Sequence, residues 1–159
     1  MDNVTIRVAT LQDIPQITEL GKELGDFHSD LGEDEFWTHP SSTPVEFTKQ
    51  LKDHISNDNS LVLVAEDVET IVSYCLAIIT SQPPEFNGKP YGSIKETLVT
   101  NSCRGKGIGK TMVSELERWF RSKDIYRVEV GVAALNDKAA AFWQKMGYIP
   151  GLVLRHKEI

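Results

Sequence analysis

Residues 94–111 read IKETLVTNSCRGKGIGKT, and this stretch decides how the rest of the chain is interpreted. It reads as a strand, a short loop and the first turn of a helix. The loop gathers three glycines and three basic residues, namely Gly105, Gly107, Gly109, Arg104, Lys106 and Lys110. A backbone without Cβ atoms can turn several N–H groups toward one point, and the helix adds the positive end of its dipole. The stretch therefore predicts a site for an anion such as a phosphate or pyrophosphate.

Composition and charge narrow the possible partners. The chain has 159 residues, of which 40% are hydrophobic and 25% charged, and this is typical of one globular domain over residues 1–159. Its 17 basic and 23 acidic residues give a net charge of −6. This balance argues against a nucleic-acid or anionic-membrane partner, which would need a basic face. The basic cluster at the glycine loop therefore predicts a specific anion site.

Several other classes of protein are also disfavoured. No apolar run approaches the ~18 residues that cross a membrane, and the N-terminus lacks the layout of a secretory signal, so we expect a cytoplasmic protein. Cys75 and Cys103 are too few for a disulfide framework. His28 and His39 lack the close-spaced partners that metal sites have, so no metal is expected.

Hydrophobic periodicity predicts alternating strands and helices. Strand patterns cover residues 4–9, 61–65, 70–80, 91–100 and 125–132, with further segments at 148–150 and 152–154, and helical patterns cover 14–24, 45–55, 108–120 and 137–146. The resulting order, β α α β β β α β α β, indicates an α/β layered fold. Two irregular segments, 27–44 and 81–91, either contact a substrate or pack onto the core.

Two well-known glycine-rich loops fit the anion site poorly. The dinucleotide-binding pattern G-x-G-x-x-G would need a glycine at Lys110. The P-loop pattern matches Gly109-Lys110-Thr111 at its end, but its first glycine would fall at Arg104. The later strand at 126–132 also lacks the aspartate that would hold Mg²⁺. A nucleotide-hydrolysing enzyme is therefore disfavoured.

A third pattern fits better. Arg104, Gly107 and Gly109 occupy the defined positions of R/Q-x-x-G-x-G/A directly after a strand, which resembles the acetyl-CoA signature of the GNAT superfamily of N-acetyltransferases. A later segment, with Asn136, Ala139, Phe142-Trp143 and Gly147-Tyr148, is similar to the pattern N-x-x-A-x-x-F-Y-x-x-x-G-F/Y of the same superfamily. The opening residues 6–10 with Asp13 also look like the first strand of these proteins. The resemblance spans the whole chain in order.

This resemblance implies a fold and a co-substrate. The fold would be a mixed, mostly antiparallel sheet of six to seven strands, flanked by about four helices, with two central strands splayed apart. Acetyl-CoA would lay its pyrophosphate on residues 104–110 and its pantetheine arm beside Leu98 and Val99, with Asn136 and Trp143 on the other side. The cofactor-binding residues would be Leu98, Val99, Arg104, Gly105, Lys106, Gly107, Ile108, Gly109, Lys110, Asn136 and Trp143.

The resemblance also points to catalytic groups. Glu96 is the candidate general base, because family members often carry an acidic residue at this place on the strand and the amine must lose a proton before it attacks. The alternative is an ordinary surface glutamate. Trp143 stands where many members have a tyrosine that protonates the leaving thiolate. The thiolate would therefore leave unaided or take a proton from water. Cys103 is expected to be an ordinary free thiol.

The function implied is transfer of an acetyl group from acetyl-CoA to a primary amine, directly within a ternary complex. The acceptor, a small molecule or a protein amino group, depends on the two irregular segments and is not fixed by the sequence. The missing tyrosine motivates an alternative, a CoA-binding regulatory module without turnover. Transfer of a longer acyl group is a third possibility. A homodimer would be in keeping with the family.

Overall fold

The computed structural model describes residues 4–30, 44–155 and 157. Over these residues the chain forms a mixed α/β arrangement of five strands and four α-helices. In chain order they are β1 (Val4–Val8), α1 (Ile14–Asp30), α2 (Pro44–Ile55), β2 (Ser60–Asp67), β3 (Thr70–Ser81), β4 (Pro90–Val99), α3 (Ile108–Ser122), β5 (Val128–Val130) and α4 (Asp137–Lys145). Short 3₁₀ turns lie at Leu11–Asp13, Pro84–Phe86 and Asn101–Cys103.

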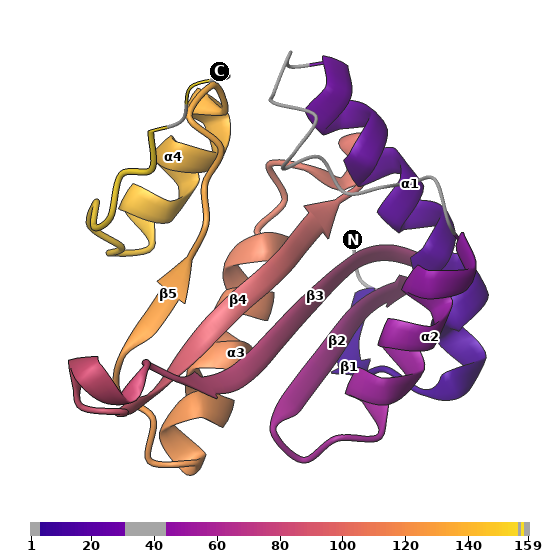
Figure 1. Cartoon of the computed structure of the whole chain (residues 1–159). Coiled ribbons are helices and arrows are strands. Elements are labelled where there is room, and N and C mark those ends of the chain that lie inside the picture. The colour runs from indigo at the N-terminus through magenta and orange to yellow at the C-terminus, as the bar shows by residue number, and fades with distance from the viewer. Residues whose placement is uncertain (1–3, 31–43, 156, 158–159) are drawn as a thin grey trace.

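The sheet follows the order of the chain, β1-β2-β3-β4-β5 (Figure 1). The first four strands pair antiparallel with their neighbours, and β5 alone runs parallel to β4. The predicted mixed, mostly antiparallel sheet is therefore confirmed. Pairing of β4 with β5 covers only three residue pairs, from Gly92 with Val128 to Ile94 with Val130. Beyond them the two strands diverge, as predicted for the splayed central pair (Figure 1).

Helices cover both faces of the sheet and enclose a core on each. On one face α3 packs Met112, Leu116 and Phe120 against β2, β3 and β4, and Trp143 of α4 joins this cluster. On the other face α1 and α2 pack against Tyr74 of β3 and its apolar neighbours. The apolar stripe predicted for residues 108–120 is thus the buried face of α3.

The junction of β4 and β5 depends on a glycine. The backbone N–H of Gly92 donates to the carbonyl of Arg127 at 2.8 Å, just before the parallel pairs begin. A Cβ atom on Gly92 would stand 2.5 Å from Cε1 of Phe120, closer than real Cβ contacts allow. Absence of a side chain therefore lets Phe120 of α3 pack directly beneath the junction.

A β-bulge interrupts β4 where the two strands part. In the pairing with β3, Ile94 lies opposite Ala77 and Glu96 lies opposite Leu76, so Lys95 is an extra residue without a partner on β3. Successive strand residues normally alternate between faces, and one extra residue reverses that alternation. Ile94 therefore belongs to the core under α3, whereas Glu96 lies on the face covered by α1 and α2.

The expectation of six to seven strands was too high for the described residues. Segments 148–150 and 152–154 carry strand-like sequence but join no sheet. Pro150 cannot donate a ladder hydrogen bond, and Gly151 weakens the extended conformation between the two segments. The apolar side chains of Ile149 and Leu152 are accordingly almost fully exposed, at 88% and 89%.

The first helix is longer than its sequence pattern indicated. The helical pattern predicted over residues 14–24 stops just before Gly25, but α1 continues to Asp30 with Gly25 buried inside. Residues 27–30 of the predicted irregular segment 27–44 are therefore helical. His39 and the rest of 31–43 lie outside the described residues. No helix within residues 4–30 and 44–155 has the length and apolar character needed to cross a membrane.

A partly buried ion-pair network connects β1 with the turn that follows it and with β2. The Arg7 guanidinium on β1 donates to both carboxylate oxygens of Asp13, at 2.7 and 2.8 Å, and to Glu66 of β2 at 2.7 Å. The carboxylate of Asp13 also accepts from the backbone N–H and the hydroxyl of Thr10. The hydrogen bond from Arg7 is the main cause that lowers the pKa of Asp13 from 3.8 to about 2.

We expect this carboxylate to make the fold sensitive to acid. A carboxyl group whose pKa falls on folding stabilises the folded state above its unfolded pKa, and that contribution disappears as the pH falls from about 4 toward 2. Asp13→Asn should lower the free energy of unfolding at pH 7 by about 2 kcal/mol. The difference from wild type should shrink toward pH 2 in urea titrations.

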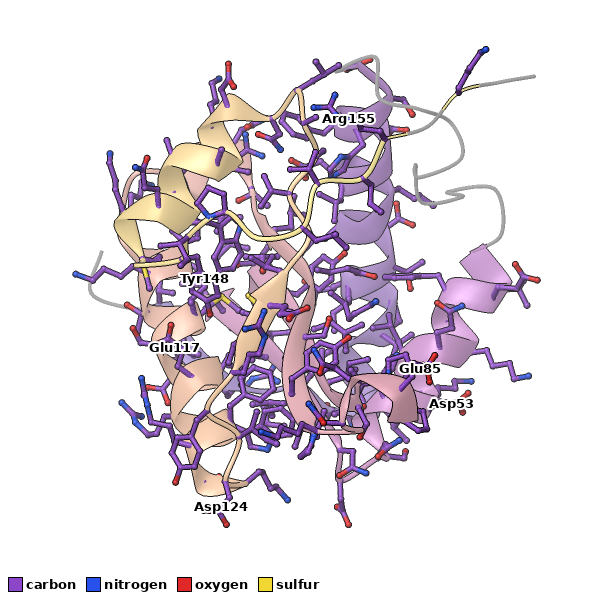
Figure 2. The ribbon with its side chains drawn as sticks, turned by 60° about the vertical axis from the view of Figure 1, so that its left-hand side comes forward. Asp53, Glu85, Glu117, Asp124, Tyr148 and Arg155 are labelled. Atoms are coloured by element: carbon purple, nitrogen blue, oxygen red, sulfur yellow. The ribbon has the colours of Figure 1, made fainter. Side chains whose placement is uncertain are left out.

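The matched control is Asp53→Asn, which alters an exposed carboxylate on α2 (Figure 2). It should change the unfolding free energy by less than about 0.5 kcal/mol at every pH. A constant difference between wild type and Asp13→Asn from pH 7 to pH 2 would contradict the assignment.

Candidate active site

A cavity of about 570 Å³ opens where β4 and β5 diverge. Its floor is the second half of β4, and its walls come from the glycine loop with the start of α3, residues 130–133 after β5, the start of α4 and the end of α1. The cavity thus begins at the last paired residues, Ile94 and Val130. Divergence of two neighbouring strands supplies a slot in which backbone groups of β4 are not all used by the sheet.

The glycine loop forms an open cradle at one end of this cavity. Gly105 and Gly107 have φ angles of +75° and +85°, a left-handed conformation that glycine adopts without strain. No atom lies within 4 Å of the position that a Cβ would take on either residue. Gly107 is followed by α3, whose first N–H groups have no acceptor within the helix. The cradle and the helix dipole together favour an anion.

Positive side chains surround the cradle. Arg104, Lys110 and Lys138 line the cavity, and Lys138 projects from the first turn of α4. Lys106 lies outside the lining, although the sequence pattern had grouped it with the binding residues. The sequence analysis missed Lys138. A lysine in the first turn of a helix is unfavourable, because its positive charge lies at the positive end of the helix dipole. Its presence there was the one sequence feature that could have indicated a nearby anion.

The Arg104 side chain reaches back to the strand. Its Nε donates to the carbonyl oxygen of Val99 at 2.9 Å, and its guanidinium carbon lies 5.5 Å from the ring centre of Phe27. This arrangement combines a hydrogen bond with a cation–π contact. It links the end of β4, the glycine loop and the end of α1 across the cavity mouth.

Glu96 lies in the same cavity on the opposite side of β4 from α3. The side chain is largely buried, with 8% exposure. The hydroxyl of Tyr74 on β3 donates to its Oε2 at 2.7 Å. Burial, followed by the charge of Glu96, raises the pKa of Tyr74 well above its ordinary value of 10. A carboxylate at the wall of a cavity is positioned to accept a proton from a bound molecule.

Asn136 and Trp143 stand on the far wall. Oδ1 of Asn136 accepts from the backbone N–H of Ala139 at 3.0 Å, so Asn136 caps α4. Trp143 is 7% exposed and makes edge contacts with Phe142 and Tyr148. Most of its ring therefore fills the core, and one edge borders the cavity.

Tyr148 does not replace the absent tyrosine at position 143. It lies outside the cavity lining, beside Glu117 of α3 (Figure 2). Burial and the charge of Glu117 raise the pKa of its hydroxyl. A hydroxyl so placed is a weaker proton donor than an ordinary tyrosine. Tyr148 thus packs against Trp143.

The two cysteines occupy different environments. Cys75 is fully buried on β3, and burial raises the pKa of its thiol to about 12. Such a thiol is inert at neutral pH. Cys103 is also free but borders the cavity beside the glycine loop. Within the described ranges no group of three or more His, Cys, Asp or Glu residues is arranged to hold a metal ion.

The irregular segments contribute unequally. The end of α1, with Leu24, Phe27 and His28, lines the cavity. None of the side chains described within residues 81–91 lines the cavity, so of the two expectations for this segment, contact with a substrate is not supported by them. All the predicted site residues except Lys106 therefore come together around one cavity.

Comparison with known proteins identifies the family. Residues 24–148 match the model of the acetyltransferase (GNAT) family. A glucosamine 6-phosphate N-acetyltransferase from Trypanosoma brucei brucei is 33% identical over 67 residues, which are 41% of this chain. The chain spans less than half the length of that relative, 44%.

Solved structures share the fold over almost the whole chain. A single-residue mutant of the BH1408 protein from Bacillus halodurans has a TM-score of 0.84 at 24% identity, covering 98% of this chain and 99% of that one. A predicted acetyltransferase from Clostridium acetobutylicum, solved with acetyl-CoA, has a TM-score of 0.76 at 18% identity (98% and 96%). An aminoglycoside acetyltransferase from an uncultured soil metagenomic sample, solved with sisomicin, has a TM-score of 0.69 at 19% identity (98% and 96%).

The splayed sheet and its anion cradle thus define an α/β protein with an anion-binding cavity at the gap between β4 and β5. The chain belongs to the acetyltransferase (GNAT) family. The predicted family is confirmed.

Proposed function

We propose that this enzyme acetylates the primary amine of a small molecule by direct transfer from acetyl-CoA. The observation that carries the proposal is that the glycine cradle and the Glu96 carboxylate open into one cavity from opposite faces of β4. An anionic co-substrate can therefore enter from the side of α3 while an amine enters from the side of α1. Both would meet at the gap between β4 and β5.

The residues around the cradle fit coenzyme A. Its pyrophosphate would lie on the backbone N–H groups of residues 104–110, with Arg104, Lys110 and Lys138 supplying positive charge. The pantetheine arm would follow Leu98 and Val99 as an added strand would, between β4 and the wall that holds Asn136 and Trp143. Arg104 would then release the carbonyl of Val99, which it now contacts.

The transfer itself needs a neutral amine and a polarised thioester. Acetyl-CoA supplies an acetyl group activated by a thiol leaving group. The amine nitrogen forms a bond to the carbonyl carbon, the carbon–sulfur bond breaks, and its electron pair leaves on the sulfur. A backbone N–H near Leu98 or Val99 would stabilise the negative charge that develops on the carbonyl oxygen. Glu96 would take the amine proton, directly or through water.

The leaving thiolate needs no tyrosine in this scheme. A free thiol has a pKa near ~8.5, so a thiolate can leave unprotonated or take a proton from water. The indole N–H of Trp143 is a donor but not an acid, and it keeps a packing role. The scheme therefore accommodates the departure from the usual sequence pattern.

Comparisons support a small amine as the acceptor. The relative from Trypanosoma brucei brucei is named for glucosamine 6-phosphate, and the metagenomic structure is an aminoglycoside acetyltransferase. Both names describe amines carried on sugar rings. The test is an acceptor screen with acetyl-CoA and a thiol reagent, covering amino sugars, aminoglycosides, polyamines, amino acids and peptide N-termini. We expect thiol release with at least one small amine; release with peptides alone would contradict the proposal.

The cradle can be tested by filling it. Gly107→Trp places a large side chain in the open space above the loop, so we expect CoA affinity to fall by about 100-fold or more in calorimetric titrations. Gly147→Trp is a matched control, because Gly147 also has a left-handed φ, of +90°, and open space but lies outside the cavity lining. Equal affinity of CoA for wild type and Gly107→Trp would refute the placement.

The role of Glu96 predicts a pH-dependent defect. Glu96→Gln keeps the shape of the side chain but cannot accept a proton, so kcat should fall by about 100-fold at pH 7. The defect should become smaller at high pH, where more of the amine is already neutral. Glu129→Gln, on β5 and outside the lining, should behave as wild type. A Glu96→Gln enzyme with the wild-type rate and pH profile would exclude the base role.

A further inference from the structure

A buried tyrosine stands behind the candidate base. We propose that Tyr74 is a positioning residue for the acetyl transfer, because its hydroxyl holds the Glu96 carboxylate in the orientation that takes the proton from the amine. The inference rests on the proposed function, since it requires Glu96 to act as the base. Tyr74 was not singled out by its sequence context.

The register of the sheet creates this contact. Tyr74 pairs with Leu98, and Glu96 pairs with Leu76, so the hydroxyl crosses diagonally from β3 to β4 over one residue pair. The bulge at Lys95 is required, because it turns Glu96 to the face on which Tyr74 lies. The 2.7 Å distance from hydroxyl to Oε2 is that of a strong hydrogen bond to a charged acceptor.

Packing fixes the tyrosine more firmly than it fixes the glutamate. The ring of Tyr74 is completely buried among apolar residues of α1, α2, β2 and β3. A close-packed ring of this size has one allowed position, so its hydroxyl is a fixed point. Glu96 has more rotatable bonds and borders an open cavity. The hydrogen bond from this fixed hydroxyl therefore holds the catalytic carboxylate in one orientation.

Tyr74 acts through Glu96 and not by itself. It lies outside the cavity lining, so it touches neither the amine nor the thioester. Burial and the Glu96 charge hold the pKa of its hydroxyl above the ordinary value, so it stays a protonated donor over the working pH range. The other titratable side chains of the cavity wall come from α1, β4, the glycine loop, α3 and α4, namely His28, Lys95, Cys103, Arg104, Lys110 and Lys138, whereas residues 130–133 contribute none.

The test removes one oxygen atom. Tyr74→Phe keeps the ring, so the fold should persist, but the carboxylate loses the hydrogen bond from this hydroxyl. We expect kcat to fall by about 10-fold at pH 7, with the acceptor KM and the CoA affinity changed by less than about 2-fold. The acidic limb of the pH–rate profile should move to higher pH, because the charged carboxylate is less stabilised. Tyr91→Phe, on β4 but outside the lining, is the matched control and should leave the profile unchanged.

A double variant separates positioning from a structural role. If Tyr74 acts through Glu96, Tyr74→Phe should slow the Glu96→Gln enzyme no further. A double variant as slow as the product of the two single effects would overturn the proposal. The proposal would also be overturned if Tyr74→Phe had the wild-type pH profile while Glu96→Gln was slow. That result would leave the assignment of Glu96 as the general base unchanged. A fully active Glu96→Gln would instead refute the base itself.

Folding is checked by thermal melting and circular dichroism. If Tyr74→Phe does not fold, Tyr74→3-fluorotyrosine gives the same information, because fluorine makes the hydroxyl a stronger donor with little change in volume. The acidic limb should then move to lower pH. A profile identical to that of wild type would count against the positioning role.

Discussion

One unpaired residue, Lys95, sets the geometry on which the rest of the structure depends. The bulge directly follows the last residue pair between β4 and β5. The side chains of β4 therefore change to the opposite face of the sheet at the point where β4 stops pairing with β5. Bulges increase local twist and end pairing, and a parallel partner that is held by only three pairs diverges readily. The gap that results is the cavity. A sheet with regular pairing through Val99 would have neither the slot nor the carboxylate beside it.

The change of side-chain direction at the bulge also places the anion cradle and the Glu96 carboxylate on opposite faces of β4. Positive side chains, the glycine cradle and the start of α3 lie on the side proposed for the anionic co-substrate, while Glu96 lies toward α1. Within the described residues Glu96 is the only acidic side chain in the cavity wall, although the chain as a whole carries a net charge of −6. The positive side chains in the cavity wall attract a polyanion, and the net negative charge of the whole chain favours the approach of a cationic amine.

Local signals predicted much of this arrangement, and the failures have physical reasons. The glycine loop was predicted because its backbone requirements are met by neighbouring residues. Gly25 did not end α1, because burial against the core outweighed its low helix propensity. The segments at 148–150 and 152–154 had strand-like composition but found no partner strand, and composition alone cannot supply one.

The sequence by itself indicated the family and predicted the anion cradle, because both depend on residues a few positions apart. Only the tertiary structure decided which face of the sheet Glu96 points to. One bulge residue moves the side chains after it to the opposite face, and the sequence shows no sign of that bulge. It also decided the partner of Glu96. Tyr74 lies 22 residues away on another strand, and the two meet only because the sheet holds that register.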